Sequence, residues 1–346
     1  MAIEVDLAIT NNCNLQCSHC CYSSGGKRYK DVPLEVIADT LAQLREMGGD
    51  ELHLAGGEPF VRPDLPQIVS IGKQLGYTVQ VLSNGYNITR EKFEELKCCG
   101  LDRILFSVDD VGEHHDKFRN QIGVFASVIK SLQMCKELGF FTRVNTVVTN
   151  ESMKRMPELN RILASVGVNR HSLFVLTPIG RGEQLSTVAP DLLQWAKFKE
   201  MMRDYALREK PYMEISAQKL FAKSCGESQF NTVCRIHERD DCIISATGDI
   251  YPCYIYTSTN IKLGNINERG IKEIWNDEEK WAQYPFFSPH KCSRCSEIVC
   301  NGGCSGYVQT VNQNVSDCDI RCKVEDGYVP DCVRVYEQLW KGNSDD

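Results

Sequence analysis

The stretch "EVDLAITNNCNLQCSHCC", residues 4–21, decides which fold class we expect for this chain. Residues 4–10 predict a strand, and four cysteines follow it directly, at positions 13, 17, 20 and 21. Such a group of thiols can hold zinc, form disulfides or carry a reactive cluster. Its place after a strand is where α/β proteins carry their reactive groups.

The pattern of strand followed by helix continues through the first 215 residues. The segment "PLEVIADTLAQLREMGG", 33–49, has apolar residues at helical spacing, with Pro33 suited to a first turn and Gly48 and Gly49 to a stop. Further strands are expected at 51–55, 77–83, 102–108, 142–149 and 171–177. Further helices are expected at 63–75, 90–99, 120–138, 155–166 and 190–209. Six strand–helix units predict an α/β fold with a parallel sheet, as a partial, open (β/α)6 TIM-like barrel or an open doubly wound sheet.

Composition limits the class of function. The 346 residues carry a net charge of -7, which argues against nonspecific binding of nucleic acid. No apolar run is long enough for a membrane span, and the N-terminus lacks the features of a signal peptide, so we expect a cytoplasmic protein. Eighteen cysteines in a reducing compartment indicate metal binding or catalysis rather than disulfides.

The second part of the chain has a different pattern. A β-hairpin is expected at 244–256, where Gly248 allows the turn. Residues 290–332 contain seven cysteines and few large aliphatic side chains, so bound metal would have to stabilise them. We place a boundary near 215–225 and expect two domains, at 1–215 and at 216–346.

The cysteine spacing Cys13-x3-Cys17-x2-Cys20 resembles the signature of the radical S-adenosylmethionine (SAM) enzymes. The resemblance implies that these three thiols bind a [4Fe–4S] cluster whose fourth iron is chelated by SAM. It also places His19 beside the adenine, with Tyr22 nearby. Cys21 stands where many relatives have a tyrosine, so it remains an alternative ligand or a bystander. Zinc, or a redox patch, is the alternative reading of these thiols.

Other segments resemble the SAM-binding elements of the same family. The segment "LAGGEPF", 54–60, contains the GGEP element that holds the SAM ammonium in the family. "LSNG", "FSVDD" and "HHDKFRN" resemble three further elements, although Asn120 replaces the usual glycine in the last of them. The candidate SAM contacts that follow from this resemblance are Gly56, Gly57, Glu58, Pro59, Ser83, Asn84, Ser107, Asp109, Asn145, Val147 and Arg181. Asn145 and Val147 are expected to share one face of a strand because strands have a two-residue period.

The C-terminal cysteines resemble a SPASM domain, which is appended to many radical SAM enzymes. The resemblance implies two auxiliary [4Fe–4S] clusters. The nearer cluster would take Cys234, Cys253 and Cys304, with Cys225 or Cys242 as the fourth ligand. The farther cluster would take Cys292, Cys295, Cys300 and Cys322. A zinc site of four thiolates is the alternative.

The resemblance implies an enzyme that reductively cleaves SAM to a 5′-deoxyadenosyl radical and takes a hydrogen atom from its substrate. The spare thiols Cys332, Cys318 and Cys21 are candidate hydrogen-atom donors. The favoured substrate is a ribosomally made peptide. The alternatives are a small molecule, modified by a dehydrogenase or decarboxylase, and a non-enzymatic iron–sulfur or zinc protein. Because the first strand begins near residue 4, leader recognition is expected to need a separate protein or another surface, and the electron donor is expected to be flavodoxin or ferredoxin.

Overall fold

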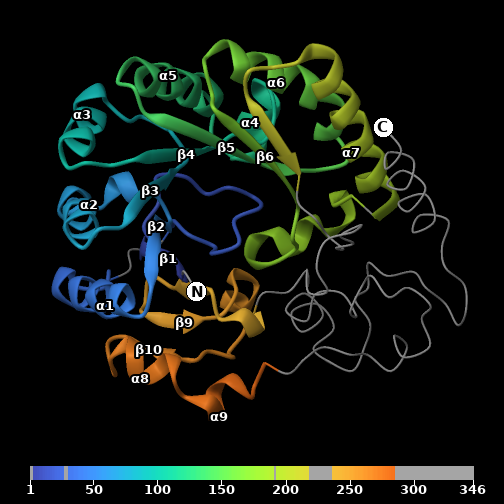
Figure 1. Cartoon of the computed structure of the whole chain (residues 1–346). Helices are drawn as coiled ribbons and strands as arrows, with labels where there is room; N and C mark the ends of the chain where they lie inside the picture. The colour runs from blue at the N-terminus through green and yellow to red at the C-terminus, as the bar shows by residue number, and fades with distance from the viewer. Residues whose placement is uncertain (1–2, 27–29, 191, 218–235, 285–346) are drawn as a thin grey trace, which may run out of the picture.

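The computed structural model describes residues 3–26, 30–190, 192–217 and 236–284. In this part of the chain, the strands form one sheet in the order β10-β9-β8-β1-β2-β3-β4-β5-β6-β7, which curls into an open arc (Figure 1). Strands β1 to β7 run parallel, and β8 joins β1 in the same direction. The strands are β1 Ile3–Thr10, β2 Gly49–Gly56, β3 Thr78–Ser83, β4 Arg103–Ser107, β5 Phe141–Val148, β6 Arg170–Val175, β7 Glu214–Ala217, β8 Asp241–Ile244, β9 Asp249–Tyr251 and β10 Gly264–Asn265.

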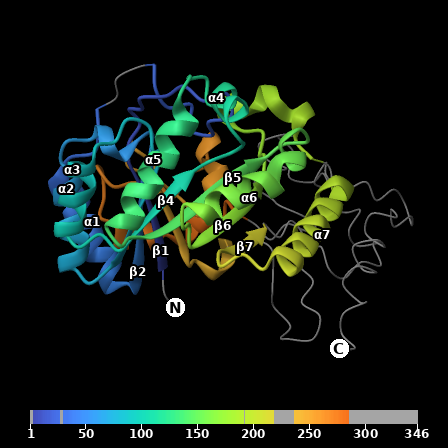
Figure 2. The same cartoon turned by 90° about the horizontal axis from the view of Figure 1, so that it is seen from above.

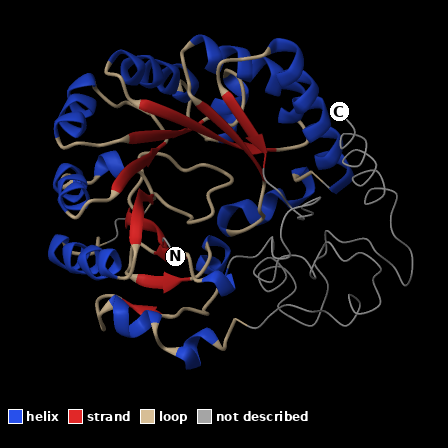
Figure 3. Ribbon diagram, in the orientation of Figure 1, coloured by secondary structure: helices blue, strands red, loops and turns tan. Residues whose placement is uncertain are grey.

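The larger helices lie along the outer face of the arc, as the ribbon in Figure 3 shows. The helices are α1 Leu34–Glu46, α2 Leu65–Gln74, α3 Arg90–Cys98, α4 Glu113–Phe118, α5 Val124–Glu137, α6 Met156–Ser165, α7 Leu192–Glu209, α8 Ile271–Trp275 and α9 Glu278–Trp281. A doubly wound sheet would carry helices on both faces. The partial, open barrel is therefore confirmed, and the six predicted strands and six predicted helices are present with ends that differ by a few residues.

The two-residue period of the strands separates a packed outer face from a polar inner face. On β1, Val5, Leu7 and Ile9 are at most 1% exposed and belong to the core beneath the helices. Their neighbours Glu4 and Asp6 lie on the opposite face and are only partly buried. This alternation turns charged side chains into the barrel interior.

Several short elements were not predicted, among them β7, β10, α4, α8 and α9. Strand β7 is only four residues long and follows α7 directly. Helix α4 is separated from α5 by Gly123, whose φ of 85° ends the preceding turn. Helix α4 and the loop after β1 lie on the same side of the sheet, above the carboxyl ends of the strands (Figure 2).

The predicted hairpin at 244–256 is formed by β8 and β9, which pair antiparallel. Gly248 takes a φ of 87° in its turn, which is the conformation that glycine adopts at low cost. Through β8, the hairpin extends the barrel sheet next to β1. The predicted domain boundary falls partly in residues 218–235, which lie outside the described residues. None of the described helices has both the length and the apolar character needed to span a bilayer.

Candidate functional site

The loop that follows β1 brings three of the four N-terminal cysteines together. Cys13, Cys17 and Cys20 pack in one small apolar cluster with Leu15 and other neighbours. The negative charges of Cys17 and Cys20 help to raise the pKa of Cys13, and that of Cys20 helps to raise the pKa of Cys17. The spacing in the sequence thus becomes a compact group of thiols at the carboxyl end of β1.

Each of the three sulfur atoms accepts at least one hydrogen bond. The backbone N–H of Leu15 donates to Cys13 Sγ at 3.4 Å, and that of Ser24 donates to Cys20 Sγ at 3.4 Å. The guanidinium of Arg119 lies 3.9 Å from Cys17 Sγ. Donors of this kind stabilise metal-bound thiolates. The donor set therefore fits an iron–sulfur cluster.

Burial opposes ionisation of these thiols when no metal is bound. It raises the pKa of Cys13 to about 12, although the hydrogen bond from Leu15 lowers it. It also raises the pKa of Cys17, in spite of the positive charge of Arg119. A bound metal cluster would supply the positive charge that makes thiolates stable in such a place.

Cys21 is placed apart from this group. It does not belong to the cluster that contains the other three cysteines, and it interacts electrostatically with Cys20 alone among them. Burial raises its pKa to about 12. Burial is the main cause that raises the pKa of the next residue, Tyr22, and the nearby charges of Asp6 and Tyr254 raise it further. This arrangement supports Cys20 over Cys21 as the third ligand.

Arg181 fastens the cysteine loop from the other side of the site. Its Nε donates to the carbonyl oxygen of Cys17 at 2.7 Å, and its Nη1 donates to that of Ser24 at 2.8 Å. Its backbone N–H donates to the Cys20 carbonyl at 3.1 Å. Arg181 was predicted as a SAM contact. In the structure, these donors hold the backbone of the loop.

The two glycines of the GGEP segment allow β2 to approach the cysteine loop closely. A Cβ atom on Gly56 would lie 2.1 Å from the Thr10 carbonyl oxygen, and one on Gly57 would lie 2.1 Å from that of Asn12. The backbone N–H of Gly57 donates to Thr10 at 2.7 Å, and that of Glu58 donates to Asn12 at 2.9 Å. The two glycines therefore let the backbone of this segment pack directly against the backbone of the cysteine loop.

Glu58 connects β2 with the end of β3. Its carboxylate accepts hydrogen bonds from Ser83 Oγ at 2.8 Å, from the Asn84 backbone at 2.7 Å and from the Phe60 backbone at 3.2 Å. Burial raises its pKa, and these donors oppose that rise. Pro59 begins the short 3-10 helix Pro59–Val61 and is buried. Glu58 therefore holds the segment in shape.

Asn84 links this segment to the cysteines. Its side-chain amide donates to Asn14 Oδ1 at 2.8 Å and lies 3.8 Å from Cys13 Sγ. The prediction that Asn84 belongs to the site on β3 is thus supported by a direct contact with a candidate ligand. Asn14, which the sequence analysis did not single out, takes part in the same contact.

A buried charge network lies beneath Cys17. Both Nε and Nη2 of Arg119 lie 2.8 Å from Asp109 Oδ2, and the Val147 backbone donates to Asp109 Oδ1 at 3.0 Å. Burial opposes the charge of Asp109, but Arg119 and two nearby histidines outweigh it and lower the pKa of Asp109 to about 2. Arg119 lies in the predicted "HHDKFRN" element but was not named as a site residue.

His19 lies over this network. Its Nε2 is 3.6 Å from Asp109 Oδ2, and its ring stacks on Phe118 with centroids 4.1 Å apart. Burial lowers its pKa to about 4, so the imidazole is neutral at pH 7. Phe118 thus covers one face of the ring that was predicted to lie beside the adenine.

Three polar residues line the inner face where the strands end. Ser107, Asn145 and Ser172 are register partners on β4, β5 and β6, and Val147 follows Asn145 on the same face. The Oδ1 atom of Asn145 is buried and accepts no hydrogen bond within the described part of the chain. A buried acceptor of this kind is available to a ligand with an N–H or O–H group. Ser172 was not predicted, because only strand pairing reveals its position.

Most of the predicted auxiliary-cluster ligands fall outside the described residues. These are Cys225, Cys234, Cys292, Cys295, Cys300, Cys304 and Cys322, together with the spare Cys318 and Cys332. Cys253 is described and lies directly after β9, partly packed against the core.

Cys242 occupies a position that does not suit a cluster ligand. It lies on β8 as the register partner of Val5, which places it on the helix-facing side of the sheet. Its side chain is fully buried in the hydrophobic core, and burial raises its pKa strongly. This position does not favour Cys242, but the choice between Cys225 and Cys242 stays a prediction, since Cys225 lies outside the described residues.

Family profiles match both parts of this chain. The Radical SAM superfamily profile matches residues 7–163, and the iron–sulfur cluster-binding SPASM profile matches residues 234–297. The first match covers the cysteine loop, the GGEP segment and the strands β1 to β5, whereas Ser172 and Arg181 lie beyond it.

Two curated relatives match along most of their length. The AdoMet-dependent heme synthase of Methanosarcina barkeri is 28% identical over 319 residues, which are 85% of this chain and 88% of the relative. The subtilosin biosynthesis protein AlbA of Bacillus subtilis is 28% identical over 324 residues, which are 91% of this chain and 69% of the relative.

Among solved structures, Streptococcus suis SuiB bound to the precursor peptide SuiA is similar with a TM-score of 0.81. The similarity covers 94% of this chain and 76% of SuiB, at 18% identity. At this level of identity the likeness shows the fold.

Proposed function

Because this chain belongs to the radical SAM superfamily and carries a SPASM domain, it is an enzyme whose cofactors are SAM and iron–sulfur clusters, and we propose that its substrate is a ribosomally made peptide. The proposal includes removal of a hydrogen atom from that peptide as the first step of its modification. The bond that forms afterwards depends on the peptide.

The single observation that carries the proposed chemistry is the grouping of Cys13, Cys17 and Cys20. Three thiols, each with at least one hydrogen-bond donor, would hold three irons of a [4Fe–4S] cluster and leave the fourth iron to SAM. When bound, this cluster supplies the electron that cleaves SAM and so produces the species that takes the hydrogen atom.

The residues of the chain have separate tasks in this proposal. Arg119 donates to Cys17 and keeps Asp109 ionised, and Asp109 in turn holds the backbone of β5. Asn145 offers its buried Oδ1 to a donor group of SAM. His19, which stays neutral, and Val147 provide apolar contact for the adenine. Burial of these groups excludes water from the reacting atoms.

Two similarities support a peptide substrate. AlbA is named for the biosynthesis of the bacteriocin subtilosin, and SuiB has been solved with its precursor peptide. The proposal further includes Cys21, Cys318 and Cys332 as candidate hydrogen-atom donors. It also includes a cytoplasmic location, reduced flavodoxin or ferredoxin as electron donor, and a separate protein for leader recognition.

A tetrapyrrole is the second candidate substrate. The observation in its favour is the similarity to the AdoMet-dependent heme synthase, which extends over 88% of that relative. Because this relative and AlbA are equally identical to the chain, sequence identity alone does not choose between the two substrates.

Anaerobic reconstitution with iron and sulfide tests the proposed chemistry. We expect about twelve irons per chain, for three clusters of four, and release of 5′-deoxyadenosine when SAM and a reductant are added. The triple variant Cys13→Ala, Cys17→Ala, Cys20→Ala should release none. Bound zinc without SAM cleavage would refute the proposal. Assays with candidate precursor peptides and with coproporphyrin III then identify the substrate class, through stimulated 5′-deoxyadenosine release and a mass change.

A further inference from the structure

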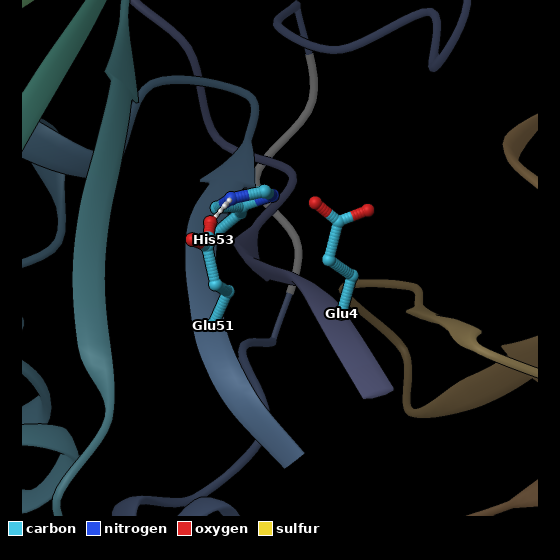
Figure 4. A group of neighbouring side chains, drawn as sticks. All are labelled: Glu4, Glu51 and His53. Carbon is cyan, nitrogen blue, oxygen red and sulfur yellow. Dashed lines mark hydrogen bonds and ion pairs between the residues drawn. The ribbon is translucent and has the colours of Figure 1, made fainter. Parts of the chain in front are cut away.

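The barrel interior below the site is divided into an acidic and a basic side. On the acidic side, Glu4, Glu51 and His53 offer ligand atoms within 4.8 Å of one another (Figure 4). His53 Nδ1 is 2.8 Å from Asp6 Oδ1, and Nε2 is 3.4 Å from Glu51 Oε2. Burial opposes charge on His53, but Asp6 outweighs it and raises its pKa. Both ring nitrogens of His53 thus lie against carboxylates, Nδ1 against Asp6 and Nε2 against Glu51.

Three arginines form the opposite side, which we call the arginine wall: Arg103 on β4, Arg143 on β5 and Arg170 on β6. Arg143 and Arg170 are direct register partners, and Arg103 stands two residues before the partner of Arg143. Arg103 reaches Glu51 on β2 at 3.2 Å, across the intervening strand β3. The arginine wall therefore faces the concave interior.

Arg143 is the least well paired member of the wall. Arg103 forms its ion pair with Glu51, and Arg170 lies 3.3 Å from Glu214. Arg143 Nη1 donates to the neutral side-chain oxygen of Gln80, at 3.2 Å. The Nε atoms of Arg143 and Arg170 are buried and donate to no acceptor among the described residues.

The electrostatic surroundings of Arg143 disfavour its charge. Burial is the main cause that lowers its pKa, and the neighbouring Arg170 and Arg103 lower it further. The carboxylates of Glu51 and Glu4 compensate only in part. An incompletely paired guanidinium in a partly buried place is stabilised by an anion that enters the interior.

We propose that the arginine wall binds a carboxylate of the substrate, with Arg143 as the residue that contacts it. This inference rests on the proposed function and narrows it to substrates that carry a carboxylate near the reacting carbon. Arg143 lies two residues before Asn145 on the same face of β5, which is about 7 Å along a strand. The carboxylate would thus be held one layer below the predicted SAM contact.

The acidic side limits what kind of anion fits. Glu4, Asp6 and Glu51 would repel a phosphate, which carries more negative charge than a carboxylate. A planar carboxylate also matches the fork of a guanidinium with two parallel hydrogen bonds. An Asp or Glu side chain of a peptide supplies this group, and so does a propionate of a tetrapyrrole.

Binding to the reconstituted, SAM-loaded enzyme tests the inference without turnover. Two pairs of probes distinguish a peptide carboxylate from a tetrapyrrole carboxylate, and each pair compares an acid with its neutral form. The first pair is N-acetylglutamic acid amide and N-acetylglutamine amide, and the second is coproporphyrin III and its tetramethyl ester. We expect the acid form of at least one pair to bind about tenfold more tightly than its neutral form, because a charge-assisted hydrogen bond is lost in the latter. Preference in the first pair indicates an acidic peptide, and preference in the second indicates a tetrapyrrole.

Substitutions test whether Arg143 causes the preference for the acid form. Arg143→Met should abolish it, and Arg143→Lys should retain part of it because the charge remains. Arg90→Met is the matched control, since Arg90 lies on the exposed face of α3 and pairs with Glu94 and Glu137. Equal affinity of acid and neutral forms in both pairs overturns the inference, as does an unchanged preference in Arg143→Met. Because release of 5′-deoxyadenosine by the wild-type enzyme is measured separately, the inference can fail while the proposed function stands.

Discussion

Loss of the Arg119 side chain should destabilise the protein and disturb the cluster together. In Arg119→Met, the buried carboxylate of Asp109 loses its main cationic partner, while the carboxylate itself remains 1% exposed. Breaking a buried ion pair by removal of one partner costs about 3–5 kcal/mol. The Cys17 sulfur also loses its donor at 3.9 Å, which should lower the reduction potential of a bound cluster.

The pKa of Asp109 gives a second measure of the same pair. Its value falls from the ordinary 3.8 to about 2; Arg119 is the largest cause of this fall and two histidines add to it, and the whole difference corresponds to about 2 kcal/mol of stability. A depressed pKa contributes stability that is complete above the unfolded pKa and is lost as the pH falls toward 2. At pH 7 the contribution is fully present, so we expect Arg119→Met to lose about 2–4 kcal/mol.

Urea unfolding at pH 7, followed by tryptophan fluorescence, measures this loss, and electrochemistry of the reconstituted enzyme measures the potential. The control Arg90→Met breaks exposed ion pairs and should lose less than about 1 kcal/mol. Adding Asp109→Asn to Arg119→Met should restore part of the stability, because the unpaired charge disappears. If Arg119→Met unfolds at the same urea concentration as Arg90→Met, the reasoning about the buried pair is wrong.

Three further predictions concern pH, the GGEP glycines and the cysteine register. The free energy of unfolding should fall as the pH drops from 6.5 toward 4, by up to about 4 kcal/mol per pH unit. The cause is three buried histidines, His19, His115 and His171, whose pKa values are lowered to about 4, 3 and 3. They stay neutral in the folded protein and bind protons when it unfolds. Urea midpoints that stay level between pH 6.5 and 4.5 would contradict this. Gly57→Ala should reduce iron content, since its Cβ would lie 2.1 Å from the Asn12 carbonyl, whereas Gly139→Ala, with open space around it, should keep its iron and lose about 1 kcal/mol. Cys21→Ala should retain the iron content of the N-terminal cluster and Cys20→Ala should lose it; the reverse result in iron analysis would move the third ligand to Cys21.

The periodic elements could be predicted because their signals are local. The helix at 33–49 is marked by its own apolar spacing, and it forms as Leu34–Glu46 with Gly48 beyond its end at a φ of 102°. The cysteine group and the GGEP segment are also local in sequence. Strand β7 was missed because four residues carry too short a pattern.

The roles of several site residues could not be predicted, since they depend on long-range contacts. Arg181 lies 157 residues from Ser24, whose carbonyl it binds, and Arg119 lies 102 residues from Cys17. The sequence places both arginines near loops but does not show which atoms they reach. The face of the sheet on which Cys242 lies could not be predicted for the same reason, because it is decided by pairing with β1.

The pattern of satisfied and unsatisfied buried atoms separates the scaffold of the site from its binding surface. Glu58 has three donors, and Asp109 is held by Arg119 and the backbone of β5, so these carboxylates have little left to offer a ligand. By contrast, Asn145 Oδ1 and Arg143 Nε lack partners within the described residues, and both side chains lie on the inner face of β5. Buried polar atoms are costly when unpaired. An acceptor above and a cationic donor below therefore support the two ligand contacts that we propose in successive layers, one for SAM and one for the carboxylate of the substrate.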